Sequence, residues 1–228
     1  MIPFLRPGDP PDAFPPLEQA LHDPDGLLCA GGDLSAARLV EAYRRGIFPW
    51  FSEGQPILWW SPDPRAVLFP GEFRISRSLG KTLRNRGFDT SLDLAFADVV
   101  AHCADEELRP EGTWISPDMR SAYLALHRLG YAHSIETWLD GRLVGGLYGV
   151  AVGRVFFGES MFSVERDASK AALKRLVDES VARSVQLIDC QLASPHLESL
   201  GARCIARTEF SELLSRAIPA ACTPGPWT

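Results

Sequence analysis

LVGGLYGVAVGRVFFGESMFS, residues 143–163, is the stretch of sequence that decides the predicted fold. Asp140-Gly141 before it and Gly153-Arg154 inside it are two-residue turn signals, so we predict two adjacent strands. The first strand carries three glycines (GGLYG) that leave much of its length without side chains. Because glycine in a strand often marks a close approach to the backbone, we expect a binding pocket here. Ordinary core packing would explain the same glycines.

Polar side chains at two strands would line this pocket. The second strand supplies aromatic residues and one acid, Glu159. A later predicted strand, LIDCQ at 187–191, places Asp189 and Gln191 on one face and Cys190 on the other. An acid beside an amide suits an amine, since both accept hydrogen bonds and the carboxylate adds charge. A satisfied polar pair at a sheet edge is the alternative. The same alternation makes Cys190 a buried core thiol rather than a nucleophile.

Length and composition fit one large or two small domains, with 228 residues, 46% hydrophobic and 23% charged. The net charge of −6 argues against a globally basic nucleic-acid binder. The chain has no apolar leader and no run of membrane-spanning length, so we expect no membrane association. The five cysteines are odd in number and lack paired metal spacing. They predict free thiols in a reducing cytoplasm and no metal site.

Residues 71–90 differ from the acidic remainder, because they contain five basic and two acidic side chains. On a helix, Arg77, Lys81 and Arg84 fall in one narrow sector, and apolar residues from Ile75 onward fall on the opposite side. A purely cationic face suits phosphate groups, although a merely solvated face would carry the same charges.

The remaining chain predicts an α+β (mixed α/β) fold in which helices are followed by a mostly antiparallel sheet. Twelve of the 18 prolines lie in the first 70 residues, so this part is expected to be loop-rich. Its tryptophans 50, 59 and 60 either form a small core or bind a ligand. A strand is expected at 132–139, and a loop around His196. Helices are expected at 34–45, 91–104, 116–130, 167–184 with Asp167 as cap, and 211–217.

Several whole segments resemble one family, the bacterial leucyl/phenylalanyl-tRNA–protein transferases. The matching runs extend in order from about residue 14 to residue 210: GLLCAGGDLS, AYRRGIFPWF, ILWWSPDPRAVL, ISRSL, TWI, AYLALHRLGYAHSIE, LVGGLYGV, FFGESMFS, ASKAAL, LIDCQ and HLESLGA. The resemblance implies a small N-terminal domain, placed here at 1–65, and at 66–228 a domain similar to the GNAT acyltransferase fold but without coenzyme A.

The resemblance also implies an activity without a cofactor. Leu or Phe, and less well Met, would pass from leucyl-, phenylalanyl- or methionyl-tRNA to the N-terminal Arg or Lys of a protein. The product would be an N-degron for ATP-dependent proteolysis. We expect a monomer that acts in the cytoplasm.

Individual positions match the functional residues of that family. The hydrophobic pocket for the aminoacyl side chain would comprise Trp50, Trp114, Leu147 and Phe156, with Glu159 and Ile188 at its edge. Asp189 and Gln191 match the catalytic pair, and the cationic face of Arg77, Lys81 and Arg84 would hold tRNA phosphates. Two helix positions where aromatic residues are expected carry Leu176 and Ser180, which leaves the preference between Leu and Phe open.

The role implied for the pair is that Asp189 polarises Gln191, which takes a proton from the attacking amine. Because a neutral amide is a very weak base, we expect the pair to orient the amine while substrate hydroxyls or water carry the proton. Asp189 would also attract the cationic side chain of the acceptor.

Two other functions stay open at this point. A GNAT-type acetyltransferase would use the same fold, although the sequence lacks the Gln/Arg-x-x-Gly-x-Gly/Ala turn that holds the coenzyme A pyrophosphate. A binding module for aminoacyl-tRNA or protein N-termini would need the pocket but not Asp189 and Gln191.

Overall fold

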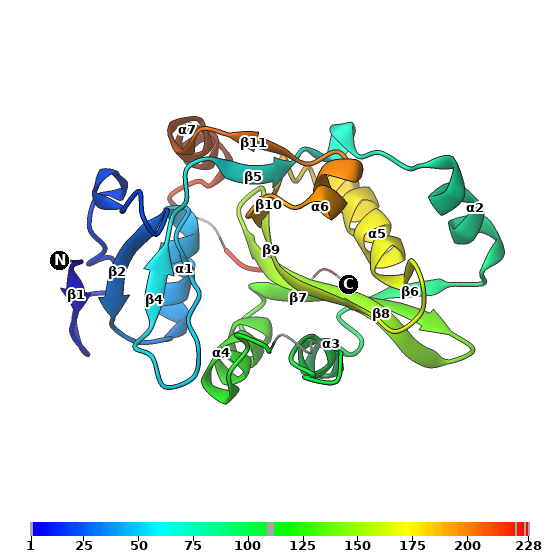
Figure 1. The fold of residues 1–228 in the computed structure, drawn as a ribbon, viewed down its shortest axis with the longest axis horizontal. Helices are drawn as coiled ribbons and strands as arrows, with labels where there is room; N and C mark the ends of the chain where they lie inside the picture. The colour runs from blue at the N-terminus through cyan, green and yellow to red at the C-terminus, as the bar shows by residue number, and fades with distance from the viewer. Residues whose placement is uncertain (1, 109–111, 222, 226, 228) are drawn as a thin grey trace.

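The chain forms two β-sheets in a computed structural model that describes residues 2–108, 112–221, 223–225 and 227 (Figure 1). The small sheet has the strand order β1-β2-β4-β3. Its strands are β1 (Phe4–Leu5), β2 (Leu27–Gly31), β3 (Phe48–Pro49) and β4 (Leu58–Trp60). The large sheet has the order β11-β5-β10-β9-β8-β7-β6. Its strands are β5 (Arg65–Leu68), β6 (Asp89–Leu92), β7 (Ala132–Leu139), β8 (Arg142–Val152), β9 (Val155–Ser163), β10 (Leu187–Gln191) and β11 (Arg203–Ile205).

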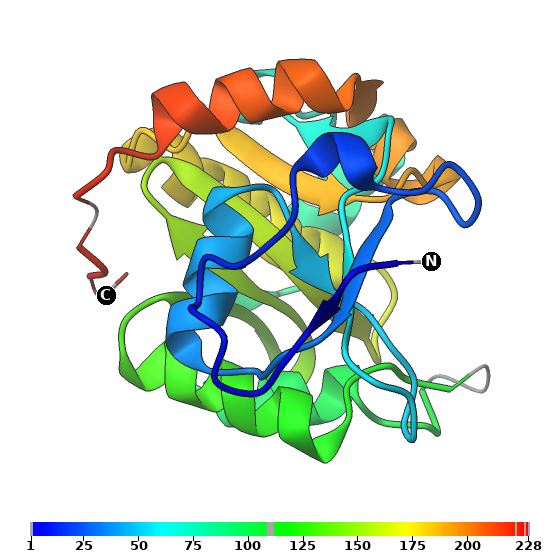
Figure 2. The same cartoon turned by 90° about the vertical axis from the view of Figure 1, so that its left-hand side faces the viewer.

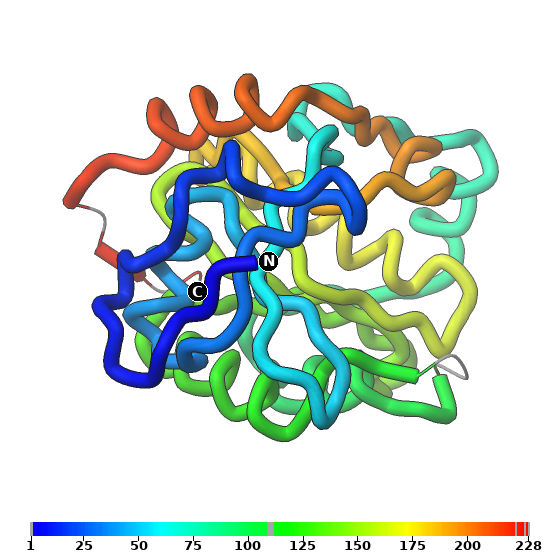
Figure 3. The backbone as a smooth tube through the Cα atoms, turned by 60° about the vertical axis from the view of Figure 1, so that its left-hand side comes forward, coloured from blue at the N-terminus to red at the C-terminus, as the bar shows by residue number. Residues whose placement is uncertain are grey.

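Helices cover both faces of the large sheet. Two helices, α3 (Phe96–Cys103) and α4 (Pro117–Arg128), pack on one face, and α5 (Ala168–Ala182) packs on the other (Figure 1). The helix of the small sheet, α1 (Ala36–Arg44), lies between α4 and α7 (Arg207–Ala217) (Figure 2). The remaining helices are α2 (Arg77–Asn85), α6 (Pro195–Ser199) and the single turns η1 (Leu17–Gln19) and η2 (Pro70–Glu72). The C-terminal segment, red in Figure 3, turns back after α7.

The predicted α+β (mixed α/β) fold with a mostly antiparallel sheet is confirmed. All pairings within the large sheet are antiparallel except that of β9 with β10. The predicted strand at 132–139 is β7, and both predicted turns join the strands of the β7-β8-β9 meander. The predicted helices at 34–45 and 116–130 are α1 and α4. Their caps are Ser35 and Ser116, whose side chains accept hydrogen bonds from the first helical turn.

Four local predictions are wrong, the last of them in part. Residues 91 and 92 end strand β6 rather than start the helix predicted at 91–104, because they pair with β7, and Asp93 with φ 55° follows the strand. Ile75 is predicted on the apolar side of the cationic helix, but it lies before Ser76, the cap of α2, and is 41% exposed. His196 lies in α6 rather than in a loop. Asp167 precedes α5 as predicted, but its carboxylate binds the Lys170 ammonium instead of capping the helix.

The glycines of β8 contact the protein itself rather than a ligand. A Cβ atom at Gly145 would lie 2.5 Å from the Cβ atom of Ala168 in α5. At Gly149 it would lie 2.5 Å from the ring of Phe156. The expectation of a ligand at these glycines is therefore wrong, and core packing accounts for them. We propose a domain boundary near residue 65, because β4 belongs to the small sheet and β5 to the large one.

Candidate functional site

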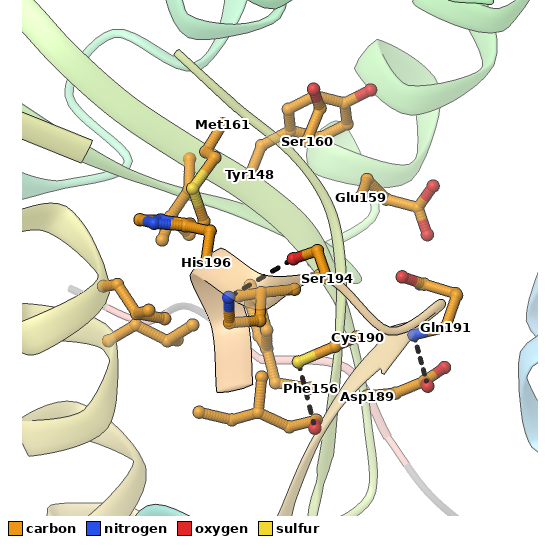
Figure 4. A pocket seen from close by; sticks show the side chains of 16 residues that line it. Tyr148, Phe156, Glu159, Ser160, Met161, Asp189, Cys190, Gln191, Ser194 and His196 are labelled. Atoms are coloured by element: carbon orange, nitrogen blue, oxygen red, sulfur yellow. Dashed lines mark hydrogen bonds between the residues drawn. The ribbon is translucent and has the colours of Figure 1, made fainter. Parts of the chain in front are cut away.

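The large sheet opens between β9 and β10. These parallel strands pair over only three positions, ending at Asp189 and Phe157. Beyond that point both strands line a cavity of about 250 Å³ (Figure 4). Because β9 and β10 separate where their pairing ends, residues of both strands line the cavity between them. The opening of the sheet thus creates the cavity.

Apolar side chains from β8, β9, β10, α5 and α6 form most of the cavity wall. The side chains of Glu159, Asp189 and Gln191 lie on one side of the cavity in Figure 4, and those of Met161 and His196 lie on the other. The volume is below the roughly 300–1,000 Å³ of pockets for drug-sized ligands, so it suits one amino-acid side chain. Its apolar lining residues are Leu147, Phe156, Met161, Leu173, Leu176, Ile188 and Leu197.

A second hollow of about 130 Å³ adjoins the first. It contains Trp50 and Trp114, together with Phe48, Pro49 and Leu192. Three residues, Glu159, Cys190 and Gln191, line both hollows. The single predicted pocket therefore divides: Leu147, Phe156, Glu159 and Ile188 line the apolar cavity, whereas Trp50 and Trp114 line the aromatic hollow beside it.

The three neighbouring tryptophans have different environments. Trp59 is fully buried, and its indole N–H donates to the Gly31 carbonyl, so it belongs to the core of the small sheet. Trp60 packs edge-on against Trp50 and donates to its carbonyl at 2.7 Å. Trp50 itself is 43% exposed. Trp50 is therefore the one of the three that offers an aromatic surface to a ligand.

Glu159 is held by two tyrosines from different parts of the chain. Tyr43 of α1 donates to Oε1 at 2.7 Å, and Tyr123 of α4 donates to Oε2 at 2.5 Å. The two hydroxyl groups also lie 3.0 Å apart. Burial raises the pKa of the Glu159 carboxyl from 4.5 to about 7, although the tyrosine hydrogen bonds oppose this shift. The site thus holds a carboxyl group that changes charge near neutral pH.

Asp189 is fully buried and forms a two-point ion pair with Arg65. The Arg65 Nε atom donates to Oδ1 at 2.8 Å and Nη2 donates to Oδ2 at 2.6 Å. Arg65 also lies between the rings of Phe48 and Phe210 and donates to the Gly46 carbonyl at 3.1 Å. The expectation that Asp189 attracts the cationic side chain of an acceptor is wrong, because its charge is buried and already paired.

The Asp189 carboxylate holds the backbone of Gln191. Oδ1 accepts a hydrogen bond from the Gln191 backbone N–H at 3.0 Å. The register of β10 against β5 shifts between these residues, and Gln191 has φ 55°. This bulge interrupts the predicted alternation of side chains, and Cys190 lines the cavity while it also packs against the apolar core beside it. Burial raises the pKa of the Cys190 thiol to about 12, which argues against a nucleophilic role as expected.

The cationic helix α2 exposes Arg77, Lys81 and Arg84, as predicted. A polar hollow of about 310 Å³ lies beside it and includes Lys81 but neither of the other two. Its further basic residues are Arg86 and Arg166, and Arg86 also pairs with Glu165 at 2.6 Å. Arg166 lies 85 residues from Lys81 in the sequence, so the helical pattern alone could not reveal it.

Sequence analysis did not identify Arg65, Tyr43 or Tyr123 as residues of the site. Arg65 had one signal, a charged residue at the start of the apolar strand RAVL, which requires a buried partner. The tyrosines had none, because 80 residues separate them.

The part of the chain described by the structure contains no group of three or more His, Cys, Asp and Glu side chains that could hold a metal ion. None of the described helices is long and apolar enough to span a membrane. Cys29, Cys190 and Cys204 are free thiols, Cys103 is buried, and Cys222 lies outside the described residues.

Similar solved structures include a GCN5-related N-acetyltransferase from Kribbella flavida, with a TM-score of 0.39, 12% identity, and coverage of 73% of this chain and 59% of that chain. A ribosomal-protein-alanine N-acetyltransferase from Brucella melitensis biovar Abortus 2308 has a TM-score of 0.36, 19% identity, and coverage of 59% and 92%.

Sequence comparison identifies the family. The model of the leucyl/phenylalanyl-tRNA protein transferase matches residues 67–215, and that of its N-terminal domain matches residues 32–63. The leucyl/phenylalanyl-tRNA–protein transferase of Aromatoleum aromaticum is 58% identical over 228 residues, which cover 100% of this chain and 95% of the relative. That of Methylococcus capsulatus is 56% identical over 227 residues, covering 100% and 97%. The chain therefore belongs to the leucyl/phenylalanyl-tRNA protein transferase family.

Proposed function

We propose that this protein transfers leucine or phenylalanine, and less well methionine, from aminoacyl-tRNA to the N-terminal Arg or Lys of an acceptor protein. The observation that carries the proposal is the pair of adjoining hollows, one apolar and one aromatic, that share Glu159 and Gln191. The product would be an N-degron for ATP-dependent proteolysis. The protein would act as a monomer in the cytoplasm.

The two hollows suit the two ends of an aminoacyl nucleoside. The apolar cavity would take the leucine or phenylalanine side chain, whose burial contributes about 1.5–3 kcal/mol. The aromatic hollow would take the terminal base of the tRNA, since stacking on an aromatic side chain contributes about 1–3 kcal/mol per base. Trp50 and Trp114 supply that surface. The ester that joins the two parts would then lie beside Gln191 and Glu159.

Transfer requires attack of the acceptor α-amine on the carbonyl carbon of this ester. The new C–N bond forms, the C–O bond to the tRNA ribose breaks, and the amine proton passes to the departing ribose oxygen. An α-amine has an ordinary pKa of about 8, so a neutral fraction exists at pH 7. Gln191 would orient the amine through its side-chain carbonyl, and a substrate hydroxyl or water would carry the proton. Asp189 would serve by holding the Gln191 backbone, supported in turn by Arg65.

The cationic surface of α2 would bind tRNA phosphates. Arg77, Lys81 and Arg84 are exposed on this helix, and Arg86 and Arg166 extend the surface at the polar hollow. Binding of this kind weakens as salt increases, because each neutralised phosphate releases counterions. The overall net charge of −6 does not prevent it, since the basic residues are clustered.

The test is the transfer of labelled leucine from leucyl-tRNA to a peptide that begins with Arg, with a peptide that begins with Asp as the control. The proposal predicts transfer to the first peptide only. Binding of leucyl-tRNA without transfer would instead indicate a binding module. Acetylation of the peptide from acetyl-coenzyme A would indicate an acetyltransferase.

Gln191→Glu tests the role of the amide in the same assay. A base stronger than an amide should retain or raise kcat if Gln191 abstracts the proton. If Gln191 instead orients the amine as a neutral amide, we expect a loss of kcat, because the carboxylate of Glu would change the position of the attacking amine and of nearby water. Gln186→Glu, which introduces the same charge at an exposed position outside both hollows, is the control.

A further inference from the structure

The C-terminal segment places a tryptophan behind the apolar cavity. Trp227 is only 6% exposed, although it follows α7 by ten residues and lies beyond residue 215, where the family model ends. Its ring lies 5.2 Å from the ring of Phe156 and 4.8 Å from the imidazole of His133, measured between centroids. Trp227 thus belongs to the apolar cluster that surrounds the cavity, together with Phe156 and Ile188.

Phe156 is held on two sides. The backbone of Gly149 lies so close that a Cβ atom there would be 2.5 Å from the Phe156 ring. Trp227 packs against the same ring from the C-terminal segment. Because Phe156 is itself a wall of the cavity, its position sets how much space an aminoacyl side chain finds.

Arg183 of the segment after α5 fixes Trp227. Its guanidinium group lies over the indole ring at 5.4 Å, and its Nη2 atom donates a hydrogen bond to the Trp227 carbonyl. A hollow of about 220 Å³, lined by Trp227, His133 and Arg183, adjoins this contact. Removal of the indole would therefore leave Phe156 free space into which it can withdraw.

We propose that Trp227 sets the depth of the aminoacyl cavity by holding the Phe156 ring, and thereby determines the preference between leucine and phenylalanine. The inference rests on the proposed function. Trp227 does not touch the substrate and acts as a positioning residue. With a small residue at position 227 the cavity deepens, which favours the larger phenylalanine side chain and loosens the fit of leucine.

The experiment compares kcat/KM for leucyl-tRNA and phenylalanyl-tRNA in Trp227→Ala, Trp227→Phe and the wild-type protein. A small difference in side-chain size in an apolar pocket changes kcat/KM by roughly 10- to 200-fold, and an indirect change belongs at the lower end. We expect Trp227→Ala to shift the ratio about tenfold toward phenylalanine. Trp227→Phe, which keeps an aromatic ring against Phe156, should stay within about twofold of the wild type.

Phe14→Ala provides the matched control for lost stability. It also removes a buried aromatic ring, but one that packs on Trp59 in the core of the small sheet. A purely structural role of Trp227 predicts equal losses with both tRNAs in Trp227→Ala, as in this control. That result, or an unchanged ratio, would overturn the inference.

A second variant covers the case in which Trp227→Ala does not fold. Arg183→Met changes an exposed residue and removes the contacts that fix Trp227. It should shift the ratio of the two kcat/KM values in the same direction by a smaller factor. An unchanged ratio in the folded Arg183→Met protein would then reject the inference. A wild-type protein that transfers neither amino acid would reject the proposed function, and the inference with it.

Discussion

Substitution of Arg65 by methionine should destabilise the protein more than almost any other single change in the site. The Arg65 and Asp189 side chains are 1% and 0% exposed, and their two contacts measure 2.8 and 2.6 Å. Methionine has a similar length, so it would fill much of the space between the Phe48 and Phe210 rings. It would leave the Asp189 carboxylate buried without a counter-ion.

The magnitude follows from the burial of this pair. Removal of one member of a buried ion pair costs about 3–5 kcal/mol, because the remaining charge is uncompensated. In a domain of this size each kcal/mol corresponds to about 2–4 °C in Tm, so Arg65→Met should lower Tm by about 6–20 °C. The double variant Arg65→Met/Asp189→Leu removes both charges. It should therefore be more stable than Arg65→Met alone, which makes the two substitutions non-additive.

The assay is urea and thermal unfolding followed by circular dichroism. Arg203→Met is the control, because Arg203 also lies over an aromatic ring but pairs with Glu72 at the surface, at 46% and 49% exposure. An exposed pair contributes about 0–1 kcal/mol, so this control should change Tm little. A loss below about 1 kcal/mol in Arg65→Met, or simple additivity in the double variant, would contradict the buried ion pair.

Three further predictions concern other parts of the molecule. The Glu159 pKa is raised from 4.5 to about 7, so the stability it contributes is complete below pH 4.5 and is lost as pH rises to 7. Glu159→Gln should remove this part of the pH dependence in urea unfolding, and an identical slope in both proteins would refute the assignment. Gly149→Ala should cost about 1–3 kcal/mol in thermal unfolding, because the added methyl group meets the Phe156 ring and the Phe157 carbonyl; unchanged stability would contradict that close contact. Lys81→Ala should weaken tRNA binding and reduce the slope of log K against log salt concentration by about one, which corresponds to one phosphate contact. Arg128→Ala, at an exposed position, should leave this slope unchanged, and equal slopes in both variants would argue against a phosphate contact of Lys81.

Local patterns in the sequence were sufficient for the elements whose signals are themselves local. Asp140-Gly141 adopts the positive φ angles that a tight hairpin needs, so the β7-β8 turn was predictable. Ser116 and Pro117 mark the start of α4 in the same way. Leu147, Phe156 and Ile188 line the cavity as predicted because they lie on strands that flank the opening.

Features that depend on contacts between distant segments could not be predicted from the sequence alone. The bulge at Cys190 arises from the register of β10 against β5, and it places that thiol in the cavity despite the period-two pattern. The charge of Asp189 is compensated by Arg65, 124 residues earlier. Trp50 and Trp114 lie in a separate hollow, because one follows β3 of the small sheet and the other precedes α4.

The tyrosine pair around Glu159 has a consequence for dissecting this protein. Tyr43 belongs to the portion that would be deleted in a truncated variant that begins at residue 66, whereas Tyr123 and Glu159 would be retained. Such a fragment would lose Arg65 from the start of β5, and it would expose the Glu159 carboxyl group to water on the side where Tyr43 now donates. Chimeras that exchange the first 65 residues between relatives should therefore be tested for a tyrosine at position 43 that donates to Glu159, and not for folding alone.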